Sequence, residues 1–131
     1  GVFEKFPSLK FAFIEVQQLW AVSVMWHMDA DWKGLRDQTP WLKRLPSEYF
    51  HEHFVCTFIQ DHVGVRNRYD VGVANMAWST DYPHHGCDWP YSRKVVNEML
   101  RDVPADERYA ICAGNMVRLY DLPQALPAPG P

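Results

Sequence analysis

The chain has 131 residues, a formal net charge of −3 at pH 7 and a high share of aromatic residues, 15%, with six Trp among them. Its Lys and Arg residues are scattered, which excludes a basic stripe for nucleic acid, and no apolar run approaches the roughly 20 residues of a membrane span. Three widely spaced cysteines (Cys56, Cys87 and Cys112) favour reduced thiols in a cytoplasmic protein over a disulfide framework or a structural zinc site.

The first elements alternate between helix and strand. Residues 1–7 indicate the end of a helix that Pro7 stops, and a strand is predicted directly afterwards, over residues 10–14. Because the chain opens on the tail of a helix, we expect it to be a C-terminal segment of something longer. Residues 18–35 are predicted to form a helix with two apolar stripes, so we expect neighbours to cover it on both sides.

The middle of the chain continues this alternation. Residues 37–46 form a long connection bracketed by prolines, and connections of this length often cover a site. A short helix is expected from Ser47 as its N-cap, followed by a strand over residues 55–59 that is rich in β-branched and aromatic types. A weak helix over residues 63–73 then leads to a third strand, predicted at residues 75–79.

Helices fill the remainder. Ser92 is expected to cap one helix, and two further helices follow Pro104, the last of them starting at Gly114. The Pro-rich residues 123–131 are expected to be disordered, which leaves 1–122 as the domain. Three strand–helix units predict an α/β fold with parallel strands. Because each strand is expected to be buried on both faces, a slice of a (β/α)₈ barrel fits the sequence better than a complete doubly wound domain does.

The loop after the third strand carries the most informative side chains. Asp81 follows the buried strand within three residues, and His84 and His85 come three and four residues later. Ligands and catalytic groups collect at the carboxyl ends of parallel strands, where an Asp with nearby imidazoles can hold a divalent metal or move a proton. The alternative is an Asp that caps the loop beside two surface histidines, and the spacing alone does not decide between them.

Several segments, taken together and in order, carry a resemblance over nearly the whole chain up to Leu122. They resemble the metal-dependent amidohydrolase superfamily, and most closely the amidohydrolase-related branch that includes aminocarboxymuconate semialdehyde decarboxylase and the resorcylate-type decarboxylases. The segments are Gly1–Phe11 at the entry to the first strand, Pro46–Phe50, Trp78–His84 around the loop described above, Asp88–Ser92, and Ala113–Tyr120 near the end.

The resemblance implies that the three strands are about strands 6–8 of a (β/α)₈ TIM barrel with one divalent metal, zinc or manganese. Asp81 would be the eighth-strand carboxylate that binds this metal and also relays a proton, while the metal polarises a substrate oxygen or activates water. The family's other ligands, a His-x-His or Glu-x-His pair on the first strand and a His on the fifth, would precede Gly1. The segment alone is therefore expected to be inactive.

The chain departs from the family pattern at the end of its first strand. The decarboxylases carry an acid/base His at the position that matches Glu15, so Glu15 is either a replacement proton carrier or metal ligand, or a cap for the following helix. His84 is expected to contact substrate or a water molecule beside the metal site. Trp89 and Tyr49 are expected to line the pocket mouth, with core packing as the alternative for both.

Two hypotheses follow. The first is a metal-dependent hydrolase or non-oxidative decarboxylase (a carbon–carbon lyase) that acts on a small carboxylate or aromatic substrate and assembles as a homo-oligomer, a dimer. The second is a non-catalytic fragment or structural subunit that associates through exposed barrel edges. A preceding segment of about 200 residues, the remainder of a barrel of typical size, that carries the His-x-His or Glu-x-His motif would decide for the enzyme.

Overall fold

Three parallel strands form the sheet at the centre of the molecule. The computed structural model describes residues 1–123. The sheet order is β1 (Phe11–Phe13), β2 (Phe54–Phe58) and β3 (Met76–Trp78), in the order of the chain. The register places Phe13 opposite Cys56 and Cys56 opposite Met76. The predicted parallel α/β arrangement is therefore present, and each strand lies within one or two residues of its predicted position.

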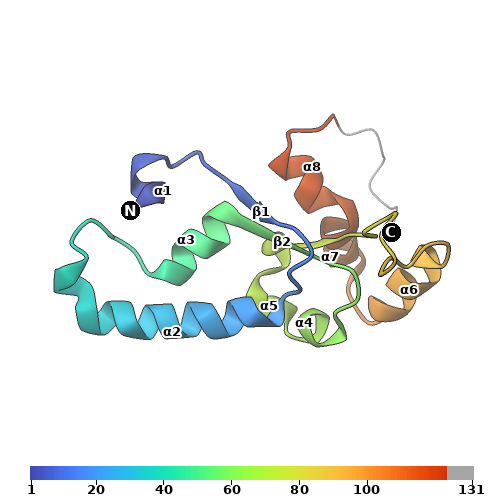
Figure 1. Ribbon diagram of the computed structural model, residues 1–131, viewed down its shortest axis with the longest axis horizontal. Coiled ribbons are helices and arrows are strands. Elements are labelled where there is room, and N and C mark those ends of the chain that lie inside the picture. The colour runs from blue at the N-terminus through green and yellow to red at the C-terminus, as the bar shows by residue number, and fades with distance from the viewer. Residues whose placement is uncertain (124–131) are drawn as a thin grey trace.

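Helices precede, connect and follow the strands (Figure 1). None of those in the described part of the chain is long and apolar enough to cross a membrane. In chain order they are α1 (Val2–Lys5) before β1; α2 (Leu19–Leu35), a 3-10 turn (Arg36–Gln38) and α3 (Pro46–His53) before β2; α4 (His62–Arg66), α5 (Arg68–Val71) and a 3-10 turn (Val73–Asn75) before β3; and α6 (Ser92–Met99), α7 (Ala105–Tyr109) and α8 (Asn115–Leu119) after it.

The buried core lies on one face of β2. Successive side chains of a strand point to opposite faces, so Cys56 and Phe58 share one face and Thr57 points to the other. Cys56 packs with Ala21 and Met25 of α2 and with Phe50 of α3. Phe58 belongs to a second buried cluster, which also contains Val65, Val71, Met76, Met99, Leu100, Val103 and Ile111.

Two serines that were predicted to cap helices have other positions. Leu45 takes the cap position of α3, because Pro46, whose backbone suits the first helical position, starts the helix two residues earlier than predicted. Ser47 instead bonds the Asp29 carboxylate with both its amide, at 2.9 Å, and its hydroxyl, at 2.6 Å, which ties α3 to α2. Ser92 is the first residue of α6, where Tyr91 holds the cap position.

The chain after Pro104 forms a single run of helix. A π-helical turn, Ala110–Gly114, joins α7 to α8, and the backbone remains right-handed helical at both junctions. The last helix predicted from Gly114 is therefore present as α8 from Asn115, but it continues the preceding helical run without a break. The buried Asn115 amide donates to the carbonyls of Val73 and Met76, which fastens this run to β3. The predicted disordered tail lies, apart from residue 123, outside the described residues.

Apolar side chains of α2 and β1 remain uncovered in the described part of the chain. Ala21 and Met25 of α2 are buried, but Trp26 is 69% exposed and Met28 is half exposed. The prediction that α2 is covered on both stripes is therefore wrong for this structure. Phe11 and Phe13, on the edge strand β1, are also exposed.

Candidate metal centre

The predicted site residues Glu15 and Asp81 lie on neighbouring loops at one end of the sheet. Glu15 comes two residues after β1 and Asp81 three residues after β3. Because the strands are parallel, both loops leave the sheet at its carboxyl end, where α/β proteins place their ligands. The topology therefore brings together two carboxylates that are 66 positions apart in the sequence.

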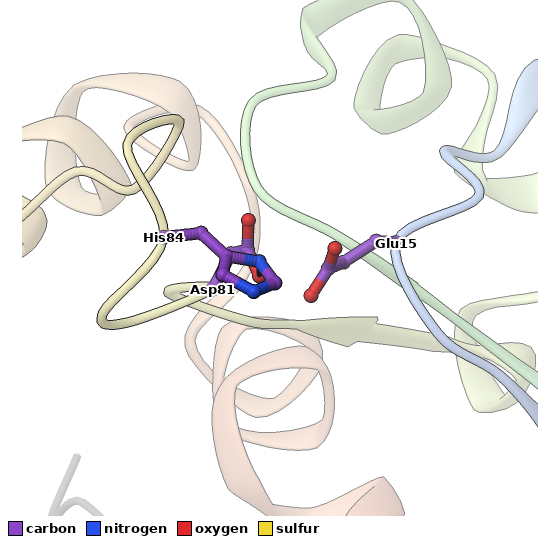
Figure 2. Close-up of side chains that lie close together, drawn as sticks. All are labelled: Glu15, Asp81 and His84. Atoms are coloured by element: carbon purple, nitrogen blue, oxygen red, sulfur yellow. Dashed lines mark ion pairs between the residues drawn. The ribbon is translucent and has the colours of Figure 1, made fainter.

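Glu15, Asp81 and His84 form a compact cluster of side chains. Figure 2 shows Glu15 facing the other two residues across the gap between the loops. One ligand atom from each residue lies within 4.8 Å of the others. The Nδ1 atom of His84 is 2.8 Å from Oδ1 of Asp81, and the Asp81 side chain is 12% exposed whereas that of His84 is 72% exposed. Asp81 is thus the sheltered member of the cluster, and His84 lies on its solvent-facing side.

The backbone at both carboxylates is unusual. Glu15 and Asp81 have positive φ angles, 60° and 55°, a left-handed conformation that is uncommon outside glycine. Such residues persist where the surroundings hold them, and they are frequent at functional sites. On the β3 side, the Ser79 amide donates to the Phe58 carbonyl at 2.8 Å, and the His84 amide donates to the Asp81 carbonyl at 2.8 Å. These bonds fold the loop so that His84 returns to Asp81.

The two carboxylates influence each other electrostatically. A hydrogen bond shared with the Asp81 side chain raises the pKa of Glu15 above its ordinary value, and some loss of solvation and the Asp81 charge act in the same direction. His84 opposes this shift. Two carboxylates at such close range are stabilised by a proton between them or by a cation, so the cluster is a place where either binds favourably.

The donor set suits a divalent metal. Carboxylate oxygens are hard donors, and imidazole nitrogen is an accepted ligand for zinc and other transition metals. Asp81 is also oriented by its contact with His84, as metal-binding carboxylates commonly are by a partner outside or beside the site. The residues present therefore fit one part of a coordination shell with mixed oxygen and nitrogen ligands.

The other two predicted site residues lie in different places. Trp89 lies in the same loop as Asp81, is 64% exposed, and meets the Tyr82 ring edge-on at a centroid distance of 5.8 Å. Tyr49 is buried in α3, which precedes β2, and its hydroxyl bonds Glu4 of α1. Both helices lie at the amino ends of the strands. The structure thus places Trp89 at the cluster's end of the sheet and Tyr49 at the opposite end, in the packing role named as its alternative.

Sequence reasoning did not identify the residues that support the cluster from β2 and its neighbouring loop. Gln60, just after β2, donates to the Asp88 carboxylate at 2.5 Å, and Asp88 is buried. Thr57 of β2 accepts a hydrogen bond from the Glu15 amide. The one sequence signal for any of these is the Asp88–Ser92 segment, which was noted for its resemblance and not for a role.

Comparisons with known proteins identify the family of the chain and a similar fold. The family model described as "Amidohydrolase" matches residues 1–122. The fold is similar to that of a dihydroxybenzoic acid decarboxylase from Polaromonas sp. JS666, crystallised with bound manganese and the inhibitor 2-nitroresorcinol, with a TM-score of 0.60 and 22% sequence identity. The match covers 95% of this chain and 37% of that one, so the chain spans little more than a third of that protein's length. Comparison with curated proteins finds no match.

Proposed function

Because this chain belongs to the amidohydrolase family, we propose that it supplies part of the active site of a metal-dependent hydrolase or non-oxidative decarboxylase. The observation that carries the proposal is the cluster of Glu15, Asp81 and His84 at the carboxyl ends of three parallel strands. Ligand and catalytic groups gather at this end of α/β sheets.

Asp81 is the main metal-binding residue in this proposal, with Glu15 and His84 beside it. Its sheltered carboxylate offers a fixed negative charge, and the His84 contact orients it. A zinc or manganese ion bound there would polarise a substrate oxygen or lower the pKa of a water molecule. The manganese in the similar decarboxylase supports a divalent metal in this role.

Glu15 is the proposed proton carrier. Without a metal, the Asp81 side chain raises the pKa of Glu15 above its ordinary value, so this carboxyl binds a proton more readily than an ordinary Glu does. Both candidate reactions need a proton from a positioned acid: decarboxylation places it on the carbon that loses CO₂, and hydrolysis places it on the leaving group. Glu15 is solvent-exposed, so it can exchange that proton with water between turnovers.

His84 and Trp89 are the proposed substrate contacts. With the proton of His84 on Nδ1, directed at Asp81, its Nε2 atom is an acceptor on the exposed side of the cluster. Trp89 and Tyr82 present exposed rings in the same loop. This combination suits a small substrate with a carboxylate or an aromatic ring, and the aromatic inhibitor in the similar decarboxylase is of that size and kind.

We propose further that the described strands are strands 6–8 of a barrel whose other strands supply the remaining ligands. The partial coverage of the similar decarboxylase and the uncovered edge strand β1 support this view. The chain alone would then be inactive, and the complete protein would be a homo-oligomer. The exposed apolar surface of α2, which includes Trp26 and Met28, also favours the second candidate, a subunit that acts through association alone.

The test uses the complete protein, including any strands that this chain lacks. Manganese and zinc content are measured together with turnover of dihydroxybenzoic acids and of simple esters and amides. The enzyme proposal expects bound metal, and turnover that is lost on chelation and restored by adding metal. His85→Ala is the matched control, because His85 is exposed and lies outside the cluster. A protein that binds no metal and turns over neither class would favour the associating subunit.

A further inference from the structure

Thr57 lies between the two strands that lead to Glu15 and Asp81. It lies in the middle strand β2, is only 3% exposed, and points to the face of the sheet opposite the helix-covered core. On one side of β2 the last paired residue of β1 is Phe13, opposite Cys56. On the other side Thr57 itself pairs with Ala77 of β3, the strand that leads to Asp81.

Thr57 holds the loop that carries Glu15 at two points. The Glu15 amide donates to the Thr57 hydroxyl at 2.7 Å, and the next amide, that of Val16, donates to the Thr57 carbonyl at 3.2 Å. Two successive amides are therefore fixed by one buried residue. Beyond them, Gln18 donates to the Cys56 carbonyl, so the loop is attached to β2 along its length.

This attachment coincides with the strained part of the loop. Glu15 and Gln17 both have φ angles of 60°, and neither is a glycine. Residues in the left-handed region persist when surrounding contacts determine their conformation. In this turned conformation the amide of Glu15 donates to the Thr57 hydroxyl, and the Glu15 side chain is directed toward Asp81 and His84 (Figure 2).

We infer that Thr57 is a positioning residue, whose hydroxyl and carbonyl hold Glu15 in the turned conformation that brings its carboxylate to Asp81. The inference rests on the proposed function, because it assigns Thr57 a part in the same metal-binding cluster. Phe58, the next residue of β2, accepts the Ser79 amide from the opposite loop. Two adjacent residues of the central strand thus fix the loop of Glu15 and the loop of Asp81.

A pair of substitutions separates the hydroxyl from the volume of the side chain. Thr57→Val keeps the branched shape and cannot accept the hydrogen bond, whereas Thr57→Ser keeps the hydroxyl and loses a methyl group. In the complete protein, residue-resolved hydrogen exchange reports on the Glu15 and Val16 amides, and calorimetric titration with manganese reports on the cluster. We expect Thr57→Val to lose protection at the Glu15 amide and to bind manganese at least about tenfold more weakly, and Thr57→Ser to keep both properties.

Each other outcome also decides the question. A Thr57→Val protein that binds manganese like the parent overturns the inference, whatever its exchange. A parent protein in which the Glu15 amide exchanges as fast as in an unstructured peptide also overturns the inference. This measurement is made on the parent, so it still decides the question if Thr57→Val fails to fold. A parent protein that binds no manganese contradicts the proposed function. In that case the structural role of Thr57 would still be supported if the Glu15 amide is protected in the parent and in Thr57→Ser and loses this protection in Thr57→Val.

Discussion

His84 and Asp81 are joined within the loop after β3, with Nδ1 of the imidazole 2.8 Å from Oδ1 of the carboxylate. The two side chains differ greatly in exposure, because Asp81 is sheltered by the loop and His84 faces solvent. The contact therefore orients a sheltered carboxylate. Partners of this kind fix the position and orientation of a metal ligand.

His84→Ala should weaken metal binding without weakening the fold. The substitution removes the partner of Asp81 and a candidate ligand, so we expect the manganese affinity to fall by about 10–100-fold. The imidazole is exposed, and the free energy of unfolding should change by no more than about 0.5 kcal/mol. Manganese titration and urea unfolding measure the two quantities. An equal loss of affinity in His85→Ala would show that the effect is not specific to the contact with Asp81.

Glu15→Gln should change stability in a pH-dependent way. Asp81 raises the pKa of Glu15, so the folded chain holds that proton more tightly than the unfolded chain does. The metal-free protein therefore loses stability as pH rises from below the ordinary value of 4.5 through the raised folded value. Glu15→Gln removes this loss. It should raise the melting temperature of the metal-free protein at pH 7 and leave it unchanged at pH 3.5, where Glu15 is protonated in both states.

Manganese should reverse the effect of Glu15→Gln at pH 7, because the ion uses the charge that the substitution removes. Thermal melts with and without the metal, at both pH values, check this. A shift in melting temperature of the same size at pH 3.5 and pH 7 would indicate that the carboxylates do not interact as the geometry implies.

Gly64→Ala should destabilise the support beneath the Glu15 loop. A Cβ atom at this position would lie 2.5 Å from Oδ2 of Asp61 and 2.6 Å from Cβ of Gln18. The Asp61 carboxylate accepts hydrogen bonds from the Gly64 and Gln18 amides, each at 2.7 Å, and would have to move. We expect a loss of roughly 1–3 kcal/mol in the free energy of unfolding.

Gly34→Ala is the matched control for this prediction. Gly34 lies within α2, and a Cβ there meets nothing within 4 Å. Replacing a helical glycine whose conformation suits alanine should stabilise the protein by roughly 0.4–1 kcal/mol. Urea unfolding of both variants of the complete protein provides the comparison, and similar effects of the two substitutions would argue against the crowding at Gly64.

The chain by itself should associate. An edge strand with unpaired amides and exposed Phe11 and Phe13, next to exposed apolar residues of α2, is a surface that other strands or copies cover. Sedimentation of residues 1–131 alone should therefore show oligomers or aggregates, and the preparation should bind zinc or manganese weakly at best. A monodisperse monomer with a cooperative thermal transition would contradict the view that these strands belong to a larger sheet.

The order of strands and helices was predictable because it depends on local patterns of apolar residues, and the parallel arrangement follows from their alternation. Features that depend on distant contacts were not predictable. His53 of α3 is buried, stacked on Phe3 at a ring-centroid distance of 4.1 Å and hydrogen-bonded to the Leu9 carbonyl. Nothing in the sequence of α3 indicates that α1 packs against it.

The candidate site was predictable to a similar degree. Asp81 could be named from its position after a strand, and Glu15 from a family position. Their approach depends on the sheet register and on two left-handed residues that are not glycines, and propensity does not predict that conformation. The support from Thr57 and the buried Asp88 was not predictable, because a Thr in a strand and an Asp in a loop have many ordinary roles.

The most direct test of the central claim is Asp81→Asn in the complete protein, with metal content and steady-state turnover measured on the same samples. The substitution keeps the size of the side chain but removes its charge and its ability to accept a proton, so both metal binding and proton relay are affected. We predict a loss of bound metal and a fall in turnover of at least about a hundredfold, with the fold retained in circular dichroism. Normal metal content and near-normal turnover in Asp81→Asn would contradict the account.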